Sequence, residues 1–134
     1  MGYGNEDVFL SQQEREALIR EYLGKTVKVT IDRPIGFHHV TKGIHLDYTI
    51  NYGFLPDVTG GDGEEQDVYV LGVSRPMETF TGIVIGAVRR KDDNEDKLVA
   101  APEGMVFTSE QIRKEIHFVE KYFDSEVFSL YDGE

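Results

Sequence analysis

The order of strand-like and helical segments is the feature that most constrains the fold of this chain. Six segments are rich in β-branched residues or alternate apolar with polar residues, as β-strands do. Helical patterns occur only once near each end, so no helix separates successive strands as in a repeated βαβ unit. The predicted strands are residues 25–34, 44–57, 67–73, 80–90, 96–102 and 126–131, and within 44–57 the alternation puts Asn51 on the polar face. We therefore expect a mainly β fold with flanking helices (α+β), built as a small antiparallel barrel or sheet.

Both predicted helices open with a capping-box sequence. Residues 11–23 begin with SQQE and residues 108–123 with TSEQ. The length of 134 residues suits one domain. We predict a single domain over residues 1–134, in which residues 1–24 form an N-terminal helical extension and residues 25–134 the barrel with its C-terminal helix. The first helix is expected to pack outside the barrel or at a subunit contact, away from the acidic pocket described below.

The composition argues against several classes of partner and site. The net charge of −11 disfavours nucleic acid and anionic membranes, because both bind basic patches. The chain has no cysteine, which excludes disulfides and thiolate metal sites. No apolar run is long enough for a membrane span, and the first residues lack the basic and apolar segments of a secretory signal. We expect a cytoplasmic protein that would need metal ions to bind an anion.

Carboxylates crowd the points where predicted strands begin or end. These residues are Asp32, Asp62, Glu64, Glu65, Asp67, Asp92, Asp93, Glu95 and Asp96. If the strand ends meet at one rim of a barrel, the carboxylate oxygens form a site suited to Mg²⁺ or Mn²⁺. The alternative is that the acidic turns are merely solvated. Composition and spacing alone favour that alternative, because acidic turns are expected in so acidic a chain.

Three motifs in a fixed order connect these turns to a known family. They are Y-x-x-N-Y-G-F at residues 48–54, D-G-E-E-Q-D-V at 62–68 and D-x-x-E-D-K-L-V-A-x-P at 92–102. Together with HFVEKYF at residues 117–123, they resemble family I soluble inorganic pyrophosphatases, over roughly residues 32–122. The resemblance implies a small OB-like antiparallel β-barrel with helices outside it. It also implies Mg²⁺ or Mn²⁺ as cofactor, pyrophosphate as substrate and a homo-oligomer.

The resemblance also implies a role for each matching residue. The metal ligands would be Asp32, Asp62, Asp67, Asp92 and either Glu95 or Asp96, depending on how the second turn is aligned. The catalytic residues would be Glu64 as proton acceptor, Tyr52 as donor to a phosphate oxygen and Lys97 as the cation among the carboxylates. Tyr122 would be a second tyrosine that binds the substrate.

Most of these residues also have a purely structural interpretation. Tyr48 and Tyr52 lie on the apolar face of one predicted strand, and Tyr122 lies on an apolar helical stripe. Spacing alone would place all three in the core, with their hydroxyls satisfied locally. Lys97 would then be the counter-charge of an exposed turn, and Asp32 would simply end a strand.

The chain departs from the family mainly in its basic residues. It lacks the family's Lys-x-Glu pair after the first strand and the arginine before Y-x-x-N-Y-G, and Phe123 stands where the family has a lysine. Lys42, His38 and His39 are the candidates to replace them as phosphate ligands, although a histidine pair in a loop is more often plain polar surface. Glu64 also replaces the family's aspartate. The metal site is therefore better supported than the substrate.

The function predicted from the sequence is Mg²⁺-dependent hydrolysis of inorganic pyrophosphate to two phosphates by a metal-activated water. One alternative is hydrolysis of another small phosphate compound. A second alternative is a catalytically impaired, metal-binding barrel that serves as an interaction module.

Overall fold

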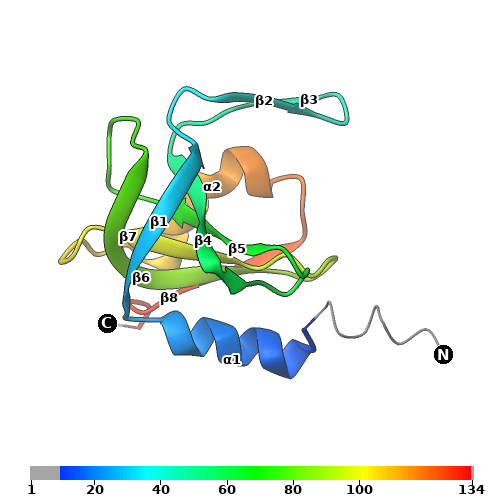
Figure 1. Cartoon of the computed structure of the whole chain (residues 1–134), viewed down its shortest axis with the longest axis vertical. Helices are drawn as coiled ribbons and strands as arrows, with labels where there is room; N and C mark the ends of the chain where they lie inside the picture. The colour runs from blue at the N-terminus through cyan, green and yellow to red at the C-terminus, as the bar shows by residue number, and fades with distance from the viewer. Residues whose placement is uncertain (1–9, 134) are drawn as a thin grey trace.

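A computed structural model describes residues 10–133, in which five strands close into a β-barrel and two helices flank it (Figure 1). The elements are α1 (Gln12–Tyr22), β1 (Thr26–Arg33), β2 (His38–Thr41), β3 (Ile44–Asp47), β4 (Asn51–Thr59), β5 (Glu65–Val70), β6 (Thr79–Arg90), β7 (Lys97–Ala101), α2 (Ser109–Glu120) and β8 (Ser125–Ser129). The strand order is β1-β4-β5-β7-β6, and β1 pairs again with the first part of β6 to close the barrel, while β8 pairs with the last part of β6. The mainly β barrel with flanking helices is confirmed.

The pairing of β5 with β7 is parallel, whereas the other pairings of the described barrel are antiparallel. Asp67 of β5 lies opposite Lys97 of β7 in this pair. Both strands therefore begin at the same end of the barrel, and the acidic turns that precede them meet there. The barrel was expected to be antiparallel, but this parallel pair makes it a mixed barrel. The same pair positions residues of the candidate site.

Helix α1 packs against the outside of the barrel, at the opposite end of the molecule from the hairpin β2–β3 (Figure 1). Its capping box forms as predicted: the Ser11 amide donates to the Glu14 carboxylate at 2.8 Å, and the Glu14 amide donates to the Ser11 hydroxyl at 3.1 Å. Ile19 is buried in a cluster with Val27 and other barrel residues. Residues 1–9 of the predicted extension lie outside the described residues, and the division into an extension and a barrel stays a prediction.

Helix α2 is shorter than the helix predicted over residues 108–123. It ends at Glu120, and Ile116 is among the residues that bury its apolar face in the core. Because the helix stops there, Tyr122 and Phe123 follow in a turn and are 46% and 37% exposed. The core interpretation of Tyr122 is therefore wrong. Neither of the helices that the structure describes is long and apolar enough to cross a membrane.

The segment predicted as one strand over residues 44–57 forms two strands. β3 ends at Asp47, β4 begins at Asn51, and the chain bends between them. β3 pairs with β2 in a hairpin that stands away from the barrel (Figure 1). Asn51, expected on a polar face, is fully buried because it connects two loops: it accepts from the Ile35 amide at 3.0 Å and donates to the Arg75 carbonyl at 2.9 Å.

The hairpin β2–β3 turns at Lys42 and Gly43. Both residues have positive φ angles, 49° and 78°, as a two-residue type I′ turn requires. His38 and His39, expected in a loop, lie on strand β2 instead. The shortened segment thus keeps an ordered hairpin above the end of the barrel.

Candidate active site

A cavity of about 430 Å³ lies between the hairpin β2–β3, one end of the barrel and the turn after α2. The predicted site residues that line it are Asp32, Lys42, Tyr52, Asp67, Glu95, Lys97 and Tyr122. Its wall also contains two arginines that were not predicted, Arg33 and Arg90. The predicted residues that do not line it are Asp62, Glu64, Asp92 and Asp96.

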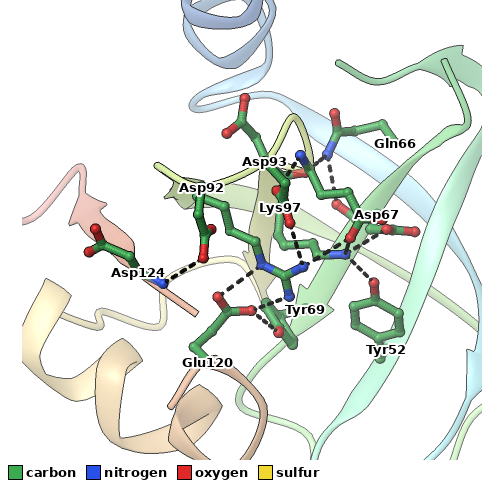
Figure 2. A network of polar contacts seen from close by, with 12 residues as sticks. Tyr52, Gln66, Asp67, Tyr69, Asp92, Asp93, Lys97, Glu120 and Asp124 are labelled. Atoms are coloured by element: carbon green, nitrogen blue, oxygen red, sulfur yellow. Dashed lines mark hydrogen bonds and ion pairs between the residues drawn. The ribbon is translucent and has the colours of Figure 1, made fainter. Parts of the chain in front are cut away.

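Lys97 is the centre of a hydrogen-bonded group on the barrel side of the cavity (Figure 2). Its buried ammonium donates to the Asp67 carboxylate at 2.7 Å, the Tyr52 hydroxyl at 2.8 Å and the Glu95 carboxylate at 3.2 Å. The parallel register of β5 and β7 places Asp67 beside Lys97, while Glu95 precedes Lys97 by two residues. Lys97 is therefore not the counter-charge of an exposed turn.

Burial and charge together set the protonation states of this group. Burial lowers the pKa of Lys97, but Asp67 and other partners outweigh it, so the pKa stands above its ordinary value. Burial, followed by the charge of Asp67, raises the pKa of Tyr52 well above its ordinary value. Burial raises the pKa of Glu95, but Lys97 and Arg90 lower it by more. At neutral pH the Tyr52 hydroxyl therefore keeps its proton, accepts from the Lys97 ammonium and lies beside the Asp67 carboxylate.

Arg90 is a second cation on the barrel side. It is buried at the end of β6, donates to Glu120 at 2.8 and 3.2 Å, and donates to Glu95 at 2.9 Å. Its guanidinium also lies 3.5 Å from the centre of the Phe123 ring. Positive charge is therefore present beside Phe123, the position of the family's lysine. Sequence analysis missed Arg90 because basic residues before an acidic turn are the usual composition of solvated turns.

Arg33 reaches the cavity through an irregularity in β1. Ile31 pairs with Gly53 and Arg33 pairs with Tyr52, so Asp32 is the additional residue of a β-bulge. Consecutive residues of a regular strand point to opposite faces, yet Asp32 and Arg33 both line the cavity. No sequence pattern marks this bulge, which is why Arg33 was not predicted.

The two acidic turns lie against each other. A side chain at Gly61 would place its Cβ only 2.6 Å from the Asn94 carbonyl oxygen, so this approach of the turns requires glycine. Asp62 follows in the first turn: partial burial, and then the charges of Glu95 and Asp67, raise its pKa. Asp62 is therefore close to both carboxylates although it does not line the cavity.

Asp96 faces α1 rather than the cavity. Its two carboxylate oxygens each accept a hydrogen bond from Arg15 at 2.7 Å, and Arg15 donates to three further groups in residues 90–94. Of the two candidate ligands in this turn, Glu95 is the one that lines the cavity. Arg15 thus ties α1 to the turn that carries Glu95, although no residue of α1 lines the cavity itself.

Glu64 and Asp92 also lie outside the cavity. Glu64 is exposed, and its amide donates to the Asp62 carboxylate at 3.0 Å. Asp92 is exposed and accepts from the Asp124 amide at 3.4 Å, near the turn after α2 (Figure 2). The roles predicted for both residues rest on the resemblance alone.

Comparison with known proteins connects this geometry to a family. The family model described as inorganic pyrophosphatase matches residues 19–127. The chain belongs to the inorganic pyrophosphatase family. This confirms the resemblance drawn from the three motifs.

The matching relatives within the family are distant. An inorganic pyrophosphatase of Xylella fastidiosa is 29% identical over 121 residues, which cover 75% of this chain and 66% of that protein. One from Ralstonia nicotianae is 34% identical over 85 residues, covering 57% of this chain and 47% of that protein. The matches thus span between about half and two thirds of these relatives' lengths.

Solved structures confirm the fold. The crystal structure of inorganic pyrophosphatase from Ehrlichia chaffeensis has a TM-score of 0.59 at 20% identity, with 81% of this chain and 88% of that chain covered. An inorganic pyrophosphatase from Helicobacter pylori has a TM-score of 0.55 at 19% identity, with 81% and 84% covered. The pyrophosphatase-type barrel is therefore shared.

The carboxylates near Lys97 have the chemistry that Mg²⁺ prefers. In the part of the chain that the structure describes, no three His, Asp or Glu side chains are grouped so as to hold a metal ion. Mg²⁺ retains several waters, however, and commonly uses only one or two carboxylates. Asp62, Asp67 and Glu95 outnumber the neighbouring cations Lys97 and Arg90, which leaves negative charge to balance. By charge and ligand type, these carboxylates suit a divalent cation.

Proposed function

We propose that this protein hydrolyses inorganic pyrophosphate to two phosphates, with Mg²⁺ as cofactor, in the cytoplasm and as a homo-oligomer. The observation that carries the proposal is the hydrogen-bonded group of Tyr52, Asp67, Glu95 and Lys97 on the wall of a 430 Å³ cavity. These residues lie inside the segment that matches the inorganic pyrophosphatase family.

Carboxylates of the acidic turns would hold the metal ion. Asp62, Asp67 and Glu95 are the proposed ligands, and Asp32 faces the cavity from the end of β1. When bound, Mg²⁺ would neutralise part of the phosphate charge and would lower the pKa of a water molecule bound to it. Lys97 keeps Asp67 and Glu95 close together, because its ammonium offsets the repulsion between them.

Hydroxyl donors would orient the phosphate groups. The Tyr52 hydroxyl accepts from Lys97 and keeps its proton, which it would donate to a phosphate oxygen in place of the neighbouring Asp67 carboxylate. Tyr122 is partly exposed on the cavity wall, where it is proposed to make a second such hydrogen bond. Lys42 stands at the hairpin turn as a cation that contacts the substrate from above.

The attacking water must lose a proton to a base. We assign this role to the carboxylate of Glu64 on the basis of the resemblance. Glu64 is exposed two residues after Asp62, a position from which it exchanges a proton with bulk water. Glu64→Gln keeps the shape of the side chain and removes the basic carboxylate, so it should lower kcat with little change in KM.

A phosphate-release assay with pyrophosphate over a range of Mg²⁺ concentrations tests the proposal. We expect turnover that requires Mg²⁺ and that Lys97→Met reduces by at least about 100-fold. Exposed Lys28 supplies a matched control, because Lys28→Met removes the same charge from the outside of β1. If no phosphate is released from pyrophosphate at any Mg²⁺ or Mn²⁺ concentration, pyrophosphate is excluded as the substrate.

A second candidate substrate class is organic phosphates. The cavity has aliphatic wall residues, Ile44, Leu46 and Val119, and carries Phe123 in place of a cation. Apolar walls with a few charged groups are typical of sites for organic ligands. The assay therefore includes ATP and sugar phosphates. If no compound is hydrolysed while Mn²⁺ still binds, the interaction-module alternative is the better account.

A further inference from the structure

Arg33 differs from the cations on the barrel side of the cavity. Lys97 and Arg90 each have at least two carboxylates within 4 Å. Within residues 10–133, Arg33 has no carboxylate at that distance, although its side chain is half-buried in a chain with an excess of acidic residues. The charge of Asp32 acts on the guanidinium without contacting it, so N–H donors remain for an anion that enters the cavity.

The guanidinium of Arg33 is also held in place by aromatic side chains. It donates to the Tyr48 hydroxyl at 2.8 Å, and it lies 5.7 Å from the centre of the Tyr48 ring and 5.4 Å from that of Tyr52. This hydrogen bond uses one of five donors, and the Tyr48 hydroxyl keeps its own proton to donate. Arg33 is thus oriented by its neighbours without being neutralised by them.

Further basic groups lie on the same side of the cavity. We term four of the residues that line the cavity the hairpin wall: Arg33, Tyr48, His39 and Lys42. Lys42 is at the exposed turn of the hairpin, and the His39 ring belongs to the strand leading to it. An oxyanion between Arg33 and Lys42 would receive donors from two separate elements.

We infer that Arg33 binds a terminal phosphoryl group of the substrate, in place of the basic residues that this chain lacks relative to its family. The inference rests on the proposed function for the class of substrate, a phosphoanhydride or phosphate ester. In this arrangement the guanidinium fork takes two phosphoryl oxygens, Lys42 closes over a third, and the bond to be cleaved points toward Asp67 and Glu95.

Binding measured without turnover tests this inference. Methylenediphosphonate, which cannot be hydrolysed at its P–C–P bridge, and inorganic phosphate are titrated into the full chain by calorimetry, with and without Mg²⁺. Arg33→Gln should weaken methylenediphosphonate binding about 10- to 100-fold, and Arg33→Lys should recover only part of the loss because a point charge lacks the fork. Arg20→Gln removes the same charge from an exposed position on α1 and should change binding less than about twofold.

A second variant tests the same inference in case Arg33→Gln does not fold. Lys42→Asn removes a charge at an exposed turn. Asparagine tolerates the positive φ of this position, so the hairpin should persist. It should weaken binding by about threefold to tenfold. In the wild-type chain, phosphate should also shift the NMR signal of the Arg33 Nε–H more than that of Arg20.

The outcomes separate this inference from the proposed activity. If methylenediphosphonate binding depends on Arg33 while pyrophosphate is not hydrolysed, the phosphate site stands and the activity fails. If pyrophosphate is hydrolysed while Arg33→Gln leaves both binding and KM unchanged, the activity stands and the site fails. Absence of binding of both probes to the wild-type chain would also overturn the site.

Discussion

The two sides of the cavity differ in how their charges are satisfied. On one side, which we term the barrel wall (Tyr52, Asp67, Glu95 and Lys97), every charged group has a partner of opposite sign. On the hairpin wall, Arg33 and Lys42 have no carboxylate within 4 Å among residues 10–133. The barrel wall is therefore a network of ion pairs, whereas Arg33 and Lys42 of the hairpin wall make no ion pair within the described residues. Under the proposed function, the barrel wall would hold the metal ion and the reacting group, and the hairpin wall would contribute most of the cations that bind substrate.

The largest effect is expected on the barrel wall. Asp67→Asn removes a proposed metal ligand and one of the partners of buried Lys97, so activity should fall about 10²- to 10⁴-fold. The free energy of unfolding should fall by roughly 1–2 kcal/mol, less than for a fully buried pair because the Asp67 side chain is 30% exposed. Phosphate release and urea unfolding measure the two effects. Asp57→Asn, on an exposed part of β4, is the control and should change neither.

The second-largest effect tests whether the contact between α1 and the turn that carries Glu95 supports the barrel wall. Arg15→Gln leaves the buried carboxylate of Asp96 without its partner, so the free energy of unfolding should fall by about 3 kcal/mol. The turn with Glu95 should also loosen, and the apparent affinity for Mg²⁺ should drop. The double variant Arg15→Gln, Asp96→Asn should be more stable than Arg15→Gln alone, because no unpaired charge remains. Equal stability of the wild type and Arg15→Gln would contradict a structural role for this contact.

The barrel wall was largely predictable from sequence, whereas on the hairpin wall Lys42 and His39 were candidates and Arg33 was missed. The motifs of the barrel wall lie in short contiguous segments, so Asp67, Glu95 and Lys97 were identified together with Tyr52. The parallel register that puts Asp67 beside Lys97 depends on pairing between strands that are separated by β6 in the chain, and no local pattern reports it.

The residues missed by sequence analysis owe their positions to irregular backbone. Arg33 enters the cavity because Asp32 is the extra residue of a bulge, whereas regular alternation would send one of the two to the other face. Strand β2 was taken for a loop because it spans only four residues, and β3 was predicted as part of one strand with β4. The bend between β3 and β4 broke an alternation that looked continuous, and buried Asn51 is the consequence. Arg15 was missed because an arginine on a helix surface reveals nothing about a turn more than 70 residues away.

A smaller effect is expected from the hairpin wall. Tyr48→Phe removes the hydroxyl that accepts from Arg33 and leaves the ring in the core. We expect KM to rise about threefold to tenfold with kcat nearly unchanged, because Arg33 is less well oriented toward the substrate while the catalytic group is intact. Tyr131→Phe is a suitable control at a partly buried tyrosine outside the cavity. A fall in kcat equal to that of Asp67→Asn would mean that the two walls do not divide binding from chemistry.

The smallest expected effect is a shift in the protonation of His39. Burial first, and then the charges of Arg33 and His38, lower the pKa of His39 below its ordinary value. His39 is therefore neutral at pH 7 and takes up a proton only as the pH falls below about 6.5. Its ring signals in an NMR titration should show a midpoint below that value, and Arg33→Gln should raise the midpoint because one neighbouring cation is gone. Phosphate should raise it as well, since a bound dianion favours the imidazolium. If phosphate moves the midpoints of exposed His117 and of His39 equally, the anion has no preference for the hairpin wall, and the contrast between the two walls is lost.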